Sequence, residues 1–170
     1  IVRFVKGGAW LDFDRDGDMD LYVSAFGESD DLFRNDGGRF VRVGAEVGIE
    51  GPVWSFAASP LDYDNDGWTD LLVTALSVPF GRGGPGDPDF MTASDAFVSD
   101  RLGLAPSPDR AEPSRRYHNV QGRFEDVTEA VGLDDQHAVM GMSVGDVDAD
   151  GALDLYFGTG APEYDALEPN

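Results

Sequence analysis

The sequence predicts an all-β protein made of repeated blades of four short antiparallel strands, and three observations support this prediction. A nine-residue acidic pattern, D-x-D-x-D-G-x-x-D, occurs three times, beginning at Asp12, Asp62 and Asp146. Each copy is followed at once by a short apolar stretch typical of a strand, at residues 21–23, 71–73 and 155–157. A second stretch that contains a polar turn also recurs in register, so a whole structural unit is repeated.

Each repeated unit is expected to begin with a strand of small residues, found at 7–9, 57–59 and 141–143. The acidic loop and the apolar second strand follow, and then comes a hairpin around a polar turn at residues 35–38 or 119–122. Small side chains are expected where the innermost strands of propeller blades crowd around a common axis. Ordinary tight packing or bulge glycines remain the alternative.

These repeats divide the chain into three expected segments. Residues 1–52 form a first blade with loop 12–20, and residues 53–136 form a second blade with loop 62–70 and an insertion at about 77–114. Residues 137–170 form an incomplete third blade with loop 146–154. The insertion is rich in proline and glycine, which predicts a long surface loop with a short helix at 94–103. It could carry a binding function or be a tolerated decoration.

About two and a half to three blades are fewer than the four to eight that usually close a propeller. We therefore expect the chain to be part of a larger propeller, or to be completed by a neighbouring chain. The unpaired edge of a partial blade invites such contacts.

Composition excludes several classes of function. The chain has 170 residues with a net charge of −21, which disfavours nucleic acid and anionic membrane surfaces as partners. It contains no cysteine, so disulfides, thiol catalysis and cysteine-based zinc or iron–sulfur sites are excluded. No apolar run is long enough to insert directly into a membrane.

The acidic loops predict metal sites, because four carboxylates in nine residues repel one another unless a cation lies between them. Alternate spacing lets a curled backbone direct the aspartates at positions 1, 3, 5 and 9 toward one centre, and glycine at position 6 permits the turn. All-oxygen ligation selects Ca²⁺ or Mg²⁺, and a flexible cage of five or more oxygens favours Ca²⁺. The expected side-chain ligands are Asp12, Asp14, Asp16 and Asp20; Asp62, Asp64, Asp66 and Asp70; and Asp146, Asp148, Asp150 and Asp154.

The residues at position 7, Asp18, Trp68 and Ala152, are expected to contribute a backbone carbonyl to each of the three Ca²⁺ sites. An EF-hand would require a bidentate glutamate at position 12, where this sequence has Val23, Val73 and Phe157.

The stretches DFDRDGDMDLYV, DYDNDGWTDLLV and DVDADGALDLYF resemble the FG-GAP/VCBS repeats of integrin-type β-propellers. The hairpin stretches LFRNDGGRFVRVGAEVGI and YHNVQGRFEDVTEAVGL are similar to the variety found in bacterial secreted proteins and cartilage acidic proteins. The resemblance implies blades whose first two strands are joined by a calcium loop. It also implies a secreted protein, extracellular or periplasmic, with a calcium-dependent interaction role such as cell adhesion. The family's metal ligands correspond to the aspartates named above.

No catalytic residue is expected. His118 lies in a hairpin and His137 at the entry to a strand, where structural roles are the default, and no nucleophile motif is present. Tyr22, Tyr156 and Trp54 fit strand packing better than a sugar-binding platform.

We therefore expect a non-enzymatic module that binds a protein or carbohydrate ligand and contacts flanking blades or another chain. Two alternatives remain: a propeller domain of a polysaccharide-active enzyme, and a peripheral structural subunit of a larger envelope complex.

Overall fold

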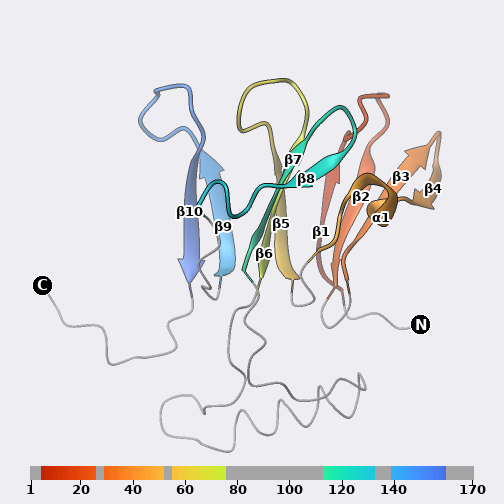
Figure 1. The fold of residues 1–170 in the computed structure, drawn as a ribbon, viewed down its shortest axis with the longest axis horizontal. Coiled ribbons are helices and arrows are strands. Elements are labelled where there is room, and N and C mark those ends of the chain that lie inside the picture. The colour runs from red at the N-terminus through yellow and green to blue at the C-terminus, as the bar shows by residue number, and fades with distance from the viewer. Residues whose placement is uncertain (1–4, 26–28, 52–54, 76–112, 133–138, 160–170) are drawn as a thin grey trace, which may run out of the picture.

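The computed structural model describes residues 5–25, 29–51, 55–75, 113–132 and 139–159, which form three antiparallel sheets (Figure 1). The first sheet has the order β1-β2-β3-β4 and the second has the order β5-β6-β7-β8. The third contains β9 and β10 within the described residues. The strands are β1 (Val5–Leu11), β2 (Asp20–Ala25), β3 (Asp31–Asp36), β4 (Arg39–Arg42), β5 (Ser55–Leu61), β6 (Asp70–Ala75), β7 (Arg115–Asn119), β8 (Phe124–Asp126), β9 (Val139–Gly145) and β10 (Asp154–Thr159).

The prediction of an all-β fold made of partial, four-stranded antiparallel blades is confirmed. The small-residue strands, the apolar second strands and both hairpins lie where the repeat predicts them. Most of the insertion, including the helix expected at 94–103, lies outside the described residues, as do Trp54 and His137.

A short helix, α1 (Gly44–Val47), follows β4 and was not expected. It ends at Gly48, whose φ of 95° is a left-handed conformation that favours glycine. The repeat-equivalent segment after β8 forms hydrogen-bonded turns instead, with Val131 N–H donating to the carbonyl of Val127.

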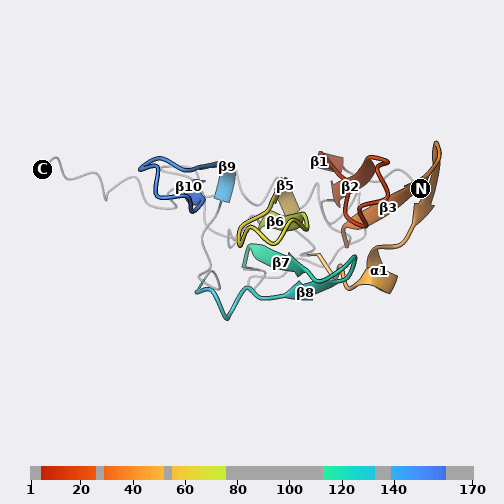
Figure 2. The ribbon, with the colours of Figure 1, turned by 90° about the horizontal axis from the view of Figure 1, so that it is seen from above.

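The three sheets lie side by side, with their first strands adjacent and their acidic loops at the same end (Figures 1 and 2). The close approach of β1 to β5 explains why small residues are required there. A Cβ added to Gly7 would lie 3.1 Å from the carbonyl oxygen of Phe56. A larger side chain at this position would push the two sheets apart.

Alternate residues of each strand face opposite sides of its sheet. Ala9 pairs with Tyr22, which pairs with Leu32, and all three are buried toward the second sheet. Trp10 pairs with Leu21 and therefore lies on the opposite face. The main core lies between the first two sheets and contains Ala9, Leu11, Phe13, Tyr22, Leu32, Val43, Ile49, Leu71, Val73, Tyr117 and Phe124.

A buried polar network also joins the first two sheets. Both the hydroxyl of Tyr22 and that of Ser55 donate to Oδ2 of Asp30, the latter at 2.5 Å. The N–H of Ala25 donates to Oδ1 of the same carboxylate at 2.8 Å. All of these groups are buried, so these hydrogen bonds satisfy polar groups that water does not reach.

The repeat-equivalent positions one blade further on carry a less polar set. Leu72 replaces Tyr22, Ser114 replaces Asp30 and Val139 replaces Ser55. Ser114 Oγ accepts the N–H of Ala75 at 3.2 Å, which matches the bond between Ala25 and Asp30. All three polar side chains of the network, Tyr22, Asp30 and Ser55, are therefore replaced together at the equivalent positions.

Two equivalent asparagines hold the hairpins to the acidic loops. Asn35 Nδ2 donates to the carbonyl of Met19 at 3.1 Å, and Asn119 Nδ2 donates to that of Thr69 at 2.9 Å. Asn119 also donates to the carbonyl of Phe13 in the neighbouring blade, at 2.8 Å. Asn119 therefore supports its own hairpin and the contact between sheets.

We predict that Asn119→Ala lowers the free energy of unfolding by about 2 kcal/mol, because it leaves buried carbonyls without a donor. Asn35→Ala is the matched control, since it removes the hairpin contact without a contact between sheets. Its effect should be smaller, about 1 kcal/mol. Urea denaturation of both variants measures the difference, and equal effects would contradict the role of Asn119 between the sheets.

Candidate metal centre

The three acidic loops share one backbone conformation. The carboxylate at position 1 accepts the N–H of the glycine at position 6: Asp12 from Gly17 at 3.2 Å, Asp62 from Gly67 at 3.0 Å and Asp146 from Gly151 at 3.0 Å. The three glycines have φ values of 92°, 87° and 89°, as the predicted sharp turn requires.

Position 4 of each loop is also left-handed, which the sequence analysis did not anticipate. Arg15, Asn65 and Ala149 have φ values of 61°, 58° and 60°. Only asparagine tolerates this region readily, so the loops hold Arg15 and Ala149 in an unfavourable conformation.

The aspartates at positions 1, 3 and 9 come together in every loop. One carboxylate oxygen from each of Asp12, Asp14 and Asp20 lies within 4.8 Å of the others, and the same holds for Asp62, Asp64 and Asp70 and for Asp146, Asp148 and Asp154. Each of these groups could hold a metal ion.

The aspartates at position 5 lie outside these three groups. Oδ1 of Asp16, of Asp66 and of Asp150 accepts the N–H of the residue at position 7, in each case at 2.8 Å. That contact fixes the turn at position 7, where Asp18, Trp68 and Ala152 were expected to offer a carbonyl. Ligation by positions 5 and 7 stays a prediction.

The aspartate at position 9 connects the loop to the hairpin. Asp20 accepts the N–H of Phe13 at 3.0 Å and that of Asn35 at 2.8 Å. Asp70 accepts the N–H of Tyr63 at 3.2 Å and that of Asn119 at 2.7 Å. Burial raises the pKa of both carboxyls above the usual value of 3.8, against the lowering effect of these hydrogen bonds.

Two further observations in the first loop favour a bound cation. Oδ1 of Asp12 is buried and accepts no hydrogen bond within the described part of the chain. Burial, followed by repulsion from Asp16, raises the pKa of Asp14. A hard cation between these carboxylates would satisfy Asp12 and relieve the repulsion, so the donor set fits Ca²⁺ or Mg²⁺.

Neighbouring loops touch one another. The guanidinium of Arg15, in the first loop, lies 5.2 Å from the ring centroid of Trp68 in the second. Arg15 is the basic residue within the first loop, yet its guanidinium contacts the second loop.

His118 is a residue whose position the sequence analysis missed. Its Nε2 lies 3.2 Å from Oδ2 of Asp64 and 3.9 Å from Oδ2 of Asp66. It occupies the place of Arg34, which instead pairs with Asp36 in its own hairpin. Aligning the two hairpins could have revealed this position, because it places residue 118 on the strand next to the second loop.

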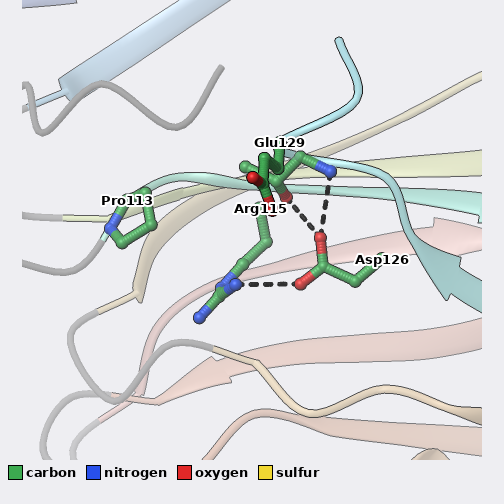
Figure 3. Close-up of a pocket in the computed structure, with 5 residues that line it drawn as sticks. Pro113, Arg115, Asp126 and Glu129 are labelled. Carbon is green, nitrogen blue, oxygen red and sulfur yellow. Dashed lines mark hydrogen bonds and ion pairs between the residues drawn. The ribbon is translucent and has the colours of Figure 1, made fainter. Parts of the chain in front are cut away.

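A separate pocket of about 440 Å³ lies beside β7 and β8 (Figure 3). Pro113, Arg115, Asp126, Thr128 and Glu129 line it. Arg115 Nη1 is paired with Asp126 Oδ2 at 2.9 Å, and Thr128 N–H donates to the same carboxylate at 3.0 Å. The one cation of this pocket is thus paired with one of its two carboxylates, whereas no such ion pair is seen within the first and third acidic loops of the described chain.

The fold and the loops together define a β-propeller-type repeat module with three carboxylate groups that could hold a metal ion. Comparison with known families agrees, because residues 12–73 match the model of the FG-GAP-like repeat. That stretch of the chain is therefore similar to an FG-GAP-like repeat. A search of curated proteins found no match. No helix in the described ranges has the length and apolar character needed to cross a membrane.

The raised pKa values of Asp20 and Asp70 predict how pH and metal act together. In the metal-free chain, the stabilising contribution of these carboxyls is complete below the unfolded value of about 3.8 and is lost as pH rises through the folded value. A bound cation requires the ionised form, so its stabilising effect grows over the same range.

We therefore expect the melting temperature difference between the chain in calcium and the chain freed of metal by dialysis to widen as pH rises above the unfolded value of about 3.8. Differential scanning calorimetry at several pH values measures it. A difference that stays constant over this range would contradict the raised pKa values.

Proposed function

We propose that the chain is a non-catalytic, calcium-binding β-propeller-type module that mediates interactions outside the cytoplasm. The observation that carries this proposal is the repeated convergence of three aspartates, at positions 1, 3 and 9, in each of three loops with the same internal hydrogen bonds. A solvated acidic turn would not need to direct carboxylates at one another three times.

Calcium is the preferred cation because every donor in the loops is an oxygen and the cage is built on a flexible backbone turn. The aspartates at positions 1, 3, 5 and 9 and the carbonyl at position 7 would hold it. The cation would neutralise the clustered charge and fix the connection between the first two strands of each blade. In this role the metal is structural.

The family resemblance and the calcium concentration that such sites require both support an extracellular or periplasmic setting. Calcium sites of extracellular modules have dissociation constants of about 10⁻⁴–10⁻³ M, so they fill where free calcium is near millimolar. Rigid blades would then present their connecting loops to a protein or glycan ligand.

Isothermal titration of the metal-free chain with CaCl₂, and separately with MgCl₂, tests the proposal. We expect about three calcium ions per chain and weaker binding of magnesium. Asp64→Ala should remove one site, while Glu125→Ala, an exposed carboxylate outside the loops, should leave the stoichiometry unchanged. Absence of calcium binding at millimolar concentration would refute the proposal.

A further inference from the structure

The second acidic loop differs from the first in the side chain that the neighbouring hairpin places beside it. His118, in β7, directs its Nε2 at this loop, 3.2 Å from Oδ2 of Asp64 and 3.9 Å from Oδ2 of Asp66. One donor atom from each of these three residues lies within 4.8 Å of the other two. The group therefore contains a nitrogen donor as well as carboxylate oxygens, and it combines a loop with a strand that is distant in the sequence.

The two carboxylates divide their oxygens between the backbone turn and the histidine. Oδ1 of Asp64 accepts the N–H of Asp66 at 3.2 Å, and Oδ1 of Asp66 accepts the N–H of Trp68 at 2.8 Å. These two contacts hold the turn of the loop. In both residues Oδ2 is the atom that faces Nε2 of His118, so the turn and a bound cation would use different oxygens.

The nitrogen of His118 is buried without a hydrogen bond. Its Nε2 has no hydrogen-bond partner within the described part of the chain, and its approach to Asp64 is an ion-pair distance only. A buried polar atom in this state is costly, and a cation beside it would remove that cost. Two donors that share a tetrahedral Zn²⁺, each about 2.0–2.1 Å from the ion, lie about 3.3 Å apart, which is close to the 3.2 Å between His118 and Asp64.

Neighbouring side chains hold the imidazole in this position. The ring of Tyr63, in the second loop, meets that of His118 edge-on, with the ring centroids 5.5 Å apart. The guanidinium of Arg116 lies 3.3 Å from the centroid of the Tyr63 ring. The imidazole therefore packs against an aromatic ring that is itself supported, which limits its freedom to turn away from the loop.

The first blade has no equivalent donor. Arg34 occupies the position of His118, and its guanidinium pairs with Asp36 in its own hairpin. A guanidinium also has no lone pair to offer a cation. Among the groups of described residues that could hold a metal ion, the one with His118 is the only one that contains a nitrogen donor. The second loop is therefore chemically distinct from the other two.

We propose that the second loop is a zinc site, held by Oδ2 of Asp64, Oδ2 of Asp66 and Nε2 of His118, and that Zn²⁺ displaces Ca²⁺ there. This inference rests on the proposed function, because it changes the metal of one loop of the module. Imidazole suits zinc, whereas calcium takes oxygen ligands. Asp64 also belongs to the group with Asp62 and Asp70, so the two ions compete for it. Three protein ligands leave a fourth position on the zinc for water.

Calorimetric titration of the metal-free chain with ZnCl₂, in a calcium-free buffer, tests the proposal. We expect a single zinc ion per chain, bound at least about tenfold more tightly than calcium. His118→Phe keeps a ring against Tyr63 but has no nitrogen donor, so it should weaken zinc binding by at least about tenfold and leave calcium binding unchanged. His137→Phe, the same change at the other histidine of the chain, should bind zinc like the wild type.

X-ray absorption at the zinc edge gives a readout that does not depend on affinity. The bound ion should show one imidazole in the wild type and in His137→Phe. A shell of oxygens alone would overturn the proposal, as would a zinc affinity that His118→Phe leaves unchanged. The measurement on the wild type decides the question whether or not the His118→Phe chain folds. In the calcium-loaded chain, zinc should release one calcium ion, and zinc that binds without such release would overturn the displacement.

The same titrations separate this inference from the proposed function. A chain that binds zinc through His118 but no calcium at millimolar concentration would refute the calcium-binding module and leave the zinc site standing. A chain that binds calcium in its loops, and zinc through oxygen alone, would refute the zinc site and leave the module standing.

Discussion

Removal of calcium is expected to lower the free energy of unfolding by about 4 kcal/mol. A site with a dissociation constant near 10⁻⁴ M would contribute about 1.4 kcal/mol when free calcium is near 10⁻³ M, and the chain has three loops that could each hold one ion. This is a large share of the roughly 5–15 kcal/mol that stabilises a typical domain. The melting temperature should fall by roughly 10 °C.

Thermal unfolding followed by circular dichroism, in about 1 mM CaCl₂ and again in excess EDTA, measures the effect. Asp64→Ala should reduce the difference by about one third, because it removes a ligand from a single loop. Equal melting temperatures in the two buffers would show that the loops do not couple a cation to folding.

Loss of the buried carboxylate between the first two sheets is expected to have the next largest effect. Asp30→Ala leaves the Tyr22 and Ser55 hydroxyls and the Ala25 N–H without their acceptor. We expect a cost of about 3 kcal/mol, since these buried polar groups lose an acceptor in the apolar interior. Chemical denaturation of the variant measures it.

The second blade supplies the compensating change. The triple variant Tyr22→Leu, Asp30→Ser, Ser55→Val installs the set found at Leu72, Ser114 and Val139, and it should recover at least half of the loss. Removing all partners of a buried network costs less than removing one. If the triple variant is less stable than Asp30→Ala, the network does not act as a unit. Asp36→Ala, an exposed carboxylate in the first hairpin, is the control and should leave the melting temperature nearly unchanged.

Local patterns in the sequence were enough to predict the strands, the hairpins and the loop glycines. The apolar stretch after each acidic loop and the turn at Asn35 act through neighbours a few residues away, so their structure follows from spacing. The convergence of the aspartates at positions 1, 3 and 9 follows from the same local turn.

Contacts between distant segments could not be predicted in this way. Asn119 reaches the carbonyl of Phe13 and Ser55 reaches Asp30 only because the sheets stack, and no local pattern encodes that placement. The left-handed conformation of Arg15 was also missed, because its side chain gives no preference for that region. The approach of His118 to Asp64 also depends on distant segments, because it results from the pairing of β6 with β7.

The double hydrogen bonding of Asp20 and Asp70 links the loops to the outer strands. Each carboxylate holds one N–H at the start of its loop and another in the third strand of its blade. A cation that fixes this carboxylate also slows the opening of the hairpin that depends on it. If the loops bind calcium, amide hydrogen exchange at Asn35 and Asn119 would report on loop occupancy from outside the loops, and the outer strands of the first two blades would stiffen as calcium rises.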